Sequence, residues 1–161
     1  MIDSEEAEWN SANVDSGKNL GHKIRKQGGY HAIPPLDIHY NLRNTMTKRL
    51  LEAGIDVKYH HHEVGGPGQS EIEILFYPLV KAADATMTTK YIVKNSAKEF
   101  GKTATFMPKP LYADAGNGMH VHMHLFKDHD PVFYKKGNYA DLSETALHFI
   151  GGVLHHGRSL A

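Results

Sequence analysis

Histidine is the residue type that stands out in this chain, because 13 of the 161 residues are histidines and they do not form one tract. Three of them alternate with apolar residues in MHVHMHLF at positions 119–126. Since successive side chains of a β-strand point to opposite faces, this pattern predicts a strand with His120, His122 and His124 on one open face. Such an array indicates a binding site and not a tag.

A second segment, HHHEVGGPGQSE at positions 60–71, carries glutamates as well as histidines. Its glycines at positions 65–68 are typical of a turn between two antiparallel strands. Side-chain alternation places His61 on the same strand face as Glu63. The hairpin therefore predicts that Glu63 and Glu71 lie close together.

Two carboxylates and one imidazole, with no cysteine in the chain, form a donor set suited to Mg²⁺ or Mn²⁺. A face rich in imidazoles also suits Zn²⁺ or Ni²⁺. The alternative is a hydrogen-bonded polar layer that binds no particular ion, and the spacing alone leaves these interpretations open. The loop DAGNG at positions 114–118 is either an ordinary turn or a place where backbone approaches a ligand closely.

The elements that must position these groups follow from periodicity and from turn residues. Asp37 and Gly54 mark the two ends of a predicted helix, and Val80, Ala83, Met87 and Tyr91 are expected to form the buried stripe of the next. Residues 1–36 have the composition of irregular chain. The predicted helices are 37–53, 78–100 and 142–161, and the predicted strands are 56–64, 71–76, 103–107 and 119–126. This order favours an α+β fold with antiparallel strands.

Composition excludes several classes of protein. The formal net charge is zero, which gives no reason to expect a nucleic-acid or anionic-membrane partner. No apolar run approaches the ~20 residues of a membrane span, and the acidic start lacks the apolar core of a secretory signal. The absence of cysteine fits a cytoplasmic protein.

Four blocks of the sequence, taken together, resemble consecutive parts of the catalytic domain of type I glutamine synthetase. They are HHHEVGGPGQSE, KAADATMTTKYIVKNSAKEFGKTATFMPKP, GNGMHVHMHLF and YADLSETALHFIGGVLHHG. WNS at positions 9–11 and KQGGYHAIPP at positions 26–35 fit the same alignment. The resemblance covers essentially all of residues 1–161, which are therefore expected to be a partial catalytic domain.

The resemblance implies an incomplete set of antiparallel strands from a barrel-like site that lies between neighbouring subunits of a homo-oligomer. It also implies an ATP-dependent ligase that joins glutamate and ammonia through γ-glutamyl phosphate, with Mg²⁺ or Mn²⁺ as cofactor. By motif position, the implied site residues are Glu63, Glu71 and His120 as metal ligands, Gly116 at the glutamate substrate, and Phe76 and His122 at the nucleotide.

The chain also departs from the family pattern. A block like PEPEF, a later block like NPTTNSYKR and the small N-terminal β-grasp domain are not found in it. Lys58, Ala115 and His124 replace residues that many members use for the nucleotide or the amino acid. The main hypothesis is therefore a ligase fragment that is inactive as an isolated piece. The alternatives are a natural reduced member that binds metal or nucleotide without catalysis, a γ-glutamyl ligase for another amine, and a simple histidine-rich metal-binding protein.

Overall fold

The computed structural model of the chain describes residue 24, residues 26–66 and residues 68–160. These residues form two compact units, and the sequence boundary between them lies after Gly118. Each unit combines helices with a short antiparallel hairpin, so the predicted α+β class is confirmed. The prediction of irregular chain over residues 1–23 lies outside the described residues.

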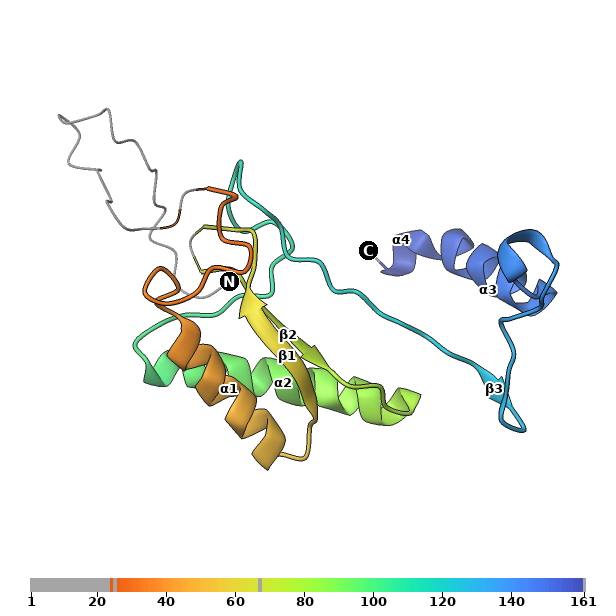
Figure 1. Cartoon of the computed structure of the whole chain (residues 1–161), viewed down its shortest axis with the longest axis horizontal. Helices are drawn as coiled ribbons and strands as arrows, with labels where there is room; N and C mark the ends of the chain where they lie inside the picture. Colours follow the sequence, from red (N-terminus) through yellow and green to blue (C-terminus); the bar gives the residue numbers. More distant parts are fainter. Residues whose placement is uncertain (1–23, 25, 67, 161) are drawn as a thin grey trace. The chain divides into compact units, whose positions relative to one another are not determined.

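The first unit consists of two helices and one hairpin. In chain order they are α1 (Tyr40–Glu52), β1 (Val57–His62), β2 (Ser70–Ile74) and α2 (Leu79–Glu99). β1 and β2 pair antiparallel, and the pair lies beside the two helices (Figure 1). The sequence predicted all four elements, with boundaries that differ by a few residues.

Apolar residues spaced one helical turn apart on α1 form the centre of the first unit. Leu42, Met46 and Leu50 are all buried, at 2%, 1% and 0% exposure, and each contributes on the order of 2 kcal/mol by leaving water. The buried α2 residues of these clusters are small: Ala97 lies with Leu42 and Met46, and Ala85 lies with Leu50. Small residues let the two helices approach closely.

The start of α1 differs from the prediction. The residue before its first turn is His39, which makes no side-chain cap bond, so Asp37 is not the N-cap. Asp37 instead accepts a hydrogen bond from the His39 backbone N–H at 3.1 Å and a bidentate pair of bonds from Arg43. Both side chains of this ion pair are buried. The predicted stop at Gly54 is confirmed, and its φ of 77° is one that favours glycine.

A β-bulge interrupts the hairpin near the start of β1. Val57 pairs with Ile74 and Tyr59 pairs with Glu73, so Lys58 is an extra residue on the β1 side. Val57 packs against the core cluster that contains Leu50, whereas Tyr59 is exposed. Simple alternation would have placed Val57 and Tyr59 on the same face, and the bulge separates them.

The predicted buried stripe of α2 is wrong. Val80, Met87 and Tyr91 are 74%, 68% and 70% exposed, and Ala83 is exposed as well. The helix packs instead through its small and β-branched residues on the opposite side. Among the residues that the structure describes, no helix is both long and apolar enough to cross a membrane.

The second unit holds a short hairpin followed by helices. The elements are β3 (Phe126–Lys127), β4 (Asp130–Pro131), the 3₁₀ turn η2 (Tyr139–Asp141), α3 (Glu144–His155) and α4 (Gly157–Leu160). Ser143 caps α3, because its hydroxyl accepts the backbone N–H of Ala146 at 3.1 Å. The ring of Phe149 packs against that of Phe133 at 5.1 Å. The predicted final helix is confirmed in position but divides at His156.

Two predicted strands are wrong. Residues 119–125 have no strand assignment, and only Phe126 and Lys127 pair with a partner. In the segment 103–107, Ala104 alone makes a bridge. The alternating pattern of residues 119–126 does not bury one face, since Met119, Val121 and Met123 are 72%, 61% and 48% exposed. An alternating sequence forms a β-strand only where a neighbouring strand pairs with it. In the part of the chain that the structure describes, no strand pairs with residues 119–125.

Candidate metal centre

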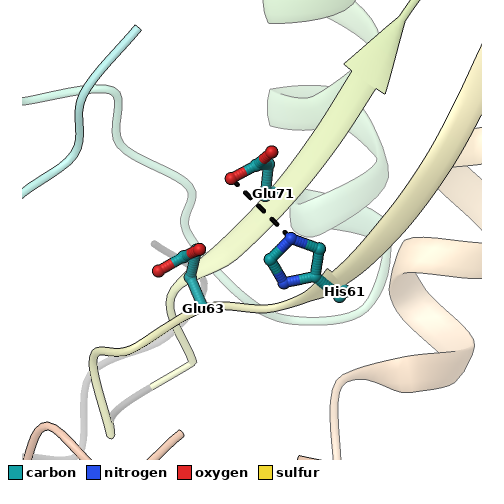
Figure 2. Close-up of side chains that lie close together, drawn as sticks. All are labelled: His61, Glu63 and Glu71. Atoms are coloured by element: carbon teal, nitrogen blue, oxygen red, sulfur yellow. Dashed lines mark ion pairs between the residues drawn. The ribbon is translucent and has the colours of Figure 1, made fainter. Parts of the chain in front are cut away.

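The β1–β2 hairpin brings one imidazole and two carboxylates together. His61 on β1 pairs directly with Glu71 on β2. The ladder continues past the end of β1, where the backbone N–H of Glu63 donates to the Gln69 carbonyl at 2.8 Å. Glu63 therefore lies on the His61 face and diagonally across from Glu71. Figure 2 shows the three side chains turned toward a common space.

The donor atoms of His61, Glu63 and Glu71 all lie within 4.8 Å of one another. His61 Nε2 lies 3.8 Å from Glu71 Oε2, which is too long for a hydrogen bond. Mg²⁺ and Mn²⁺ bind oxygen and nitrogen at ~2.1 Å, so two ligands of one octahedral ion lie about 3.0 to 4.2 Å apart. The spacing of the imidazole and the carboxylate falls within this interval. The predicted proximity of Glu63 and Glu71 is confirmed.

The hydrogen bonding of His61 leaves the correct nitrogen for a cation. Its Nδ1 lies 2.9 Å from the carbonyl oxygen of His62. A carbonyl can only accept, so Nδ1 carries a proton, and Nε2, which faces Glu71, is the ring nitrogen available to a cation. An imidazole held by a carbonyl in this way is the usual arrangement of a metal-binding histidine. The donor set therefore fits a divalent cation.

The other two histidines of the HHH run support the fold. His62 is buried at 1% exposure, and its Nδ1 donates to the Glu63 carbonyl at 2.7 Å. His60 contacts the Asn44 side chain on α1 at 2.9 Å. Burial is the main cause that lowers the pKa of both imidazoles, and the nearby Arg43 charge lowers them further. These two rings therefore remain neutral to lower pH than an exposed histidine.

A glycine lets the preceding loop pack against the end of β1. The backbone N–H groups of Gly29 and His31 donate to the carbonyls of Val64 and His62, each at 3.0 Å. A Cβ on Gly29 would lie 2.5 Å from both the Glu63 carbonyl oxygen and the His62 ring. This close approach places the His31 ring in a stack on His61, with centroids 4.5 Å apart and planes 10° apart. The His61 ring is thus packed against this loop.

The next carboxylate along β2 is engaged elsewhere. Glu73 accepts an ion pair from Lys58 at 2.7 Å. It also accepts a hydrogen bond from Tyr59, and this bond is the largest cause that raises the pKa of Tyr59 to about 12. Glu73 therefore pairs with a lysine, whereas Glu71 lies nearest to the His61 imidazole at 3.8 Å and Glu63 accepts the backbone N–H of Val64 at 2.7 Å. Lys58, one of the departures from the family pattern, has its charge neutralised in this pair.

The loop that carries Gly116 is connected to the hairpin. The buried amide of Gln69 donates to the Gly116 carbonyl at 2.7 Å and to the Asn117 side-chain oxygen at 3.0 Å. A Cβ on Gly116 would lie 2.7 Å from the Pro108 carbonyl oxygen, so the loop requires glycine at this position. The predicted substrate loop and the predicted metal hairpin are therefore neighbours.

The remaining predicted site residues are placed differently. Phe76 follows β2 in the first unit and its side chain is 66% exposed. His120 and His122 belong to the second unit and are exposed, and their roles beside Glu63 and Glu71 stay a prediction. The imidazole that does join the two carboxylates, His61, was not assigned as a ligand from the sequence. The signal was available, because His61 and Glu63 are two residues apart on one strand.

The geometry is that of a mixed α-helix and β-hairpin domain with a carboxylate–imidazole cluster whose donor atoms suit a divalent cation. Comparison with known families gives a specific result. The family model described as "Glutamine synthetase, catalytic domain" matches residues 1–161. The chain belongs to this family, and the predicted resemblance is confirmed.

Individual relatives agree with the family match. The chain is 51% identical to a glutamine synthetase of Frankia alni over 159 residues, and 51% identical to one of Pseudomonas aeruginosa over 160 residues. Both alignments cover 99% of this chain and 34% of the relative. The chain therefore spans about a third of the length of these curated relatives.

Solved structures confirm the fold. A cryo-electron microscopy structure of Plasmodium falciparum glutamine synthetase matches 92% of this chain and 29% of its own, with a TM-score of 0.80 and 31% identity. A structure described as a GmaS/ADP complex matches 81% of this chain and 30% of its own, with a TM-score of 0.71 and 29% identity. The described residues thus have the fold of part of a glutamine synthetase chain, with no closed barrel among them.

Proposed function

We propose that this chain contributes the cation-binding hairpin and the substrate loop of an ATP-dependent glutamate–ammonia ligase. The observation that supports this most directly is the convergence of His61, Glu63 and Glu71 on one face of the hairpin. Membership of the glutamine synthetase family gives that convergence its chemical context. The proposed cation is Mg²⁺ or Mn²⁺, because two of the three donors are carboxylates.

The chain's own residues perform binding and orientation. Glu63 and Glu71 hold the cation by their charge, and His61 offers a neutral nitrogen that is oriented by the His62 carbonyl. The bound cation neutralises charge on carboxylate and phosphoryl groups. The loop at Gly116 places backbone close to the substrate, since it has no side chain there.

ATP, glutamate and ammonia are the proposed substrates, with His120 as a further metal ligand and Phe76 and His122 at the nucleotide. The ADP complex of a structural relative supports nucleotide binding. We also propose that the isolated 161 residues form no glutamine, because phosphoryl transfer depends on positioned positive charge and the chain spans about a third of its relatives. A homo-oligomer and a cytoplasmic location belong to the same proposal.

A second candidate function is ligation of glutamate to a different amine, or cation binding without catalysis. Lys58 and Ala115 stand where many family members carry a nucleotide-binding or glutamate-binding residue. Lys58 forms an ion pair with Glu73 of the same hairpin. This observation favours a nucleotide contact that differs from that of the family.

The test is a titration of the purified 161-residue chain with MnCl₂, followed by electron paramagnetic resonance of free Mn²⁺. Glu63→Ala is expected to weaken binding by at least about tenfold, because loss of a ligand exceeds the loss of an outer-shell contact. His120→Ala is expected to weaken it as well. Glu73→Ala is the matched control, since it removes a carboxylate from the same hairpin outside the cation group, and it should leave the affinity unchanged.

Equal Mn²⁺ affinity in the parent and in Glu63→Ala would overturn the cation site. Much tighter binding of Zn²⁺ or Ni²⁺ than of Mn²⁺, abolished by replacing His120, His122 and His124 together, would support a simple histidine-rich site instead. A γ-glutamyl hydroxamate assay on the same preparation tests activity, and product formation by the isolated chain would contradict its proposed inactivity. In the complete protein, competition among amines in that assay separates ammonia from other acceptors.

A further inference from the structure

A buried side-chain amide lies between the cation hairpin and the substrate loop. Gln69 is 3% exposed and belongs to the turn that joins β1 and β2. Its Oε1 accepts the backbone N–H of Gly65 at 2.7 Å. Its Nε2 donates to the Gly116 carbonyl at 2.7 Å and to Asn117 Oδ1 at 3.0 Å. One side chain thus bonds to both segments.

The orientation of this amide is fixed by its partners. The Gly65 N–H can only donate and the Gly116 carbonyl can only accept, so the oxygen of Gln69 faces the turn and the nitrogen faces the loop. Both donor hydrogens and the acceptor are used. No other natural side chain of this length supplies one acceptor and two neutral donors.

The loop is itself tightly organised around the two residues that Gln69 contacts. Asn117 donates from its backbone to the Pro108 carbonyl at 2.7 Å and from its side chain to the Met107 carbonyl at 2.7 Å. Gly116 lies so close to Pro108 that a Cβ would be 2.7 Å from its carbonyl oxygen. These contacts hold the turn together, so a displacement of Gln69 is expected to move the turn as a unit.

On the hairpin side, Gln69 is directly bonded to a proposed cation ligand. Its backbone carbonyl accepts the N–H of Glu63 at 2.8 Å, and Glu71 follows it by two residues. A cation that draws Glu63 and Glu71 together must fix the backbone on both sides of Gln69.

We infer that Gln69 is a positioning residue that couples cation binding on the hairpin to the conformation of the Gly116 loop. Binding of a cation between His61, Glu63 and Glu71 fixes the backbone of residues 63–66 and 68–71, and the hydrogen bonds of the Gln69 amide restrain Gly116 and Asn117 in turn. Coupling between two sites is reciprocal, so a substrate that fixes the loop also strengthens cation binding. This inference rests on the proposed function.

The test is amide hydrogen exchange of peptides covering residues 114–118, measured in the 161-residue chain with and without MnCl₂. In the parent chain, Mn²⁺ is expected to slow exchange in this loop. Gln69→Met keeps the length of the side chain and removes all three side-chain hydrogen bonds. It is expected to speed metal-free exchange in the loop by about tenfold, as the loss of a buried hydrogen bond predicts, and to abolish the response to Mn²⁺.

Two further variants complete the design. Asn95→Ala removes a side-chain amide bond to the Tyr91 carbonyl on the exposed face of α2, and it should leave loop exchange and its Mn²⁺ response unchanged. If circular dichroism shows that Gln69→Met does not fold, Asn117→Ala removes one of the acceptors of Gln69, and a weakened response to Mn²⁺ is expected. An unchanged response in the folded variant would overturn the inference.

The two proposals fail in different ways. If the parent chain does not bind Mn²⁺, the cation site and the coupling to it are both wrong. If it does bind Mn²⁺ and the Gln69→Met loop exchanges as slowly as that of the parent, the cation site stands and the role of Gln69 is wrong.

Discussion

The two grouped carboxylates of the hairpin repel each other in the metal-free chain. Their oxygens lie within 4.8 Å, and at that separation two unit charges repel by about 1 kcal/mol in water and about 3 kcal/mol at an effective dielectric constant of 20. The Glu71 side chain is 43% exposed, so screening by solvent brings the repulsion toward the lower value. Glu71→Gln removes one charge and keeps the shape of the side chain. We expect the metal-free variant to be more stable than the parent by about 1 kcal/mol.

Mn²⁺ should make the parent more stable than Glu71→Gln. A ligand at 100 times its dissociation constant stabilises the folded parent by about 2.7 kcal/mol, and Glu71→Gln loses most of this because the cation loses a charged ligand. The variant is thus expected to unfold about 2 to 4 °C above the parent in EDTA and below the parent in saturating MnCl₂. A reversal in the order of the two unfolding temperatures on addition of Mn²⁺ distinguishes a carboxylate that binds the cation from one that only stabilises the fold.

The assay is thermal unfolding monitored by pulsed hydrogen exchange of peptides covering residues 57–74, so that the signal comes from the hairpin. It is performed at pH 8, where imidazoles are largely neutral, and at low salt, because salt screens the repulsion. Glu73→Gln is the control, since it breaks the ion pair with Lys58 and should slightly destabilise the chain while preserving the Mn²⁺ response. A Glu71→Gln variant that is less stable in EDTA and still stabilised by Mn²⁺ would refute the reasoning.

Two further predictions concern the buried charges beneath the hairpin. Asp37→Asn leaves the guanidinium of Arg43 buried without its counter-charge, and it should lower the free energy of unfolding by about 3 kcal/mol in urea titrations. The double variant Asp37→Leu with Arg43→Met should recover most of that loss. No recovery would contradict the conclusion that the unpaired buried charge is the cause. Burial lowers the pKa of His62, so the unfolded chain binds a proton before the folded chain does. Stability from this residue is complete above pH ~6.5 and is lost as the pH falls through the lower folded-state pKa. Urea midpoints at pH 7.5 and 5.5 check this, and a higher midpoint at pH 5.5 would contradict it.

The elements that could be predicted from sequence are those specified by local signals. Leu42, Met46 and Leu50 recur at helical spacing, and the glycine turn joins two alternating segments, so α1 and the hairpin were both found. The proximity of Glu63 and Glu71 followed from the hairpin alone. These predictions needed no knowledge of long-range packing.

The failures arose where packing, and not periodicity, decides the structure. On α2 the large apolar residues Val80 and Tyr91 are exposed, whereas Ala97 is fully buried, because the close contact with α1 selects small residues. The role of His120 as an imidazole ligand, taken from family resemblance, stays a prediction, whereas His61, which the structure places beside Glu63, was not assigned from the sequence. Gln69 gave no local signal at all, since its loop partners lie 47 and 48 residues away in the chain.

The β-bulge at Lys58 determines which residues of β1 are available for chemistry. Because one extra residue separates Val57 from Tyr59, Val57 can anchor the strand in the core while His61 and Glu63 face the proposed cation site. A strand of the same sequence without the bulge would place Val57 on the face of His61 and Glu63, so either that anchor would leave the core or the two site residues would turn inward. The bulge, and not only the composition of this strand, therefore decides which side chains reach the proposed site. Inserting one residue between Tyr59 and His60 should be tolerated far less than an insertion in the exposed turns of the second unit.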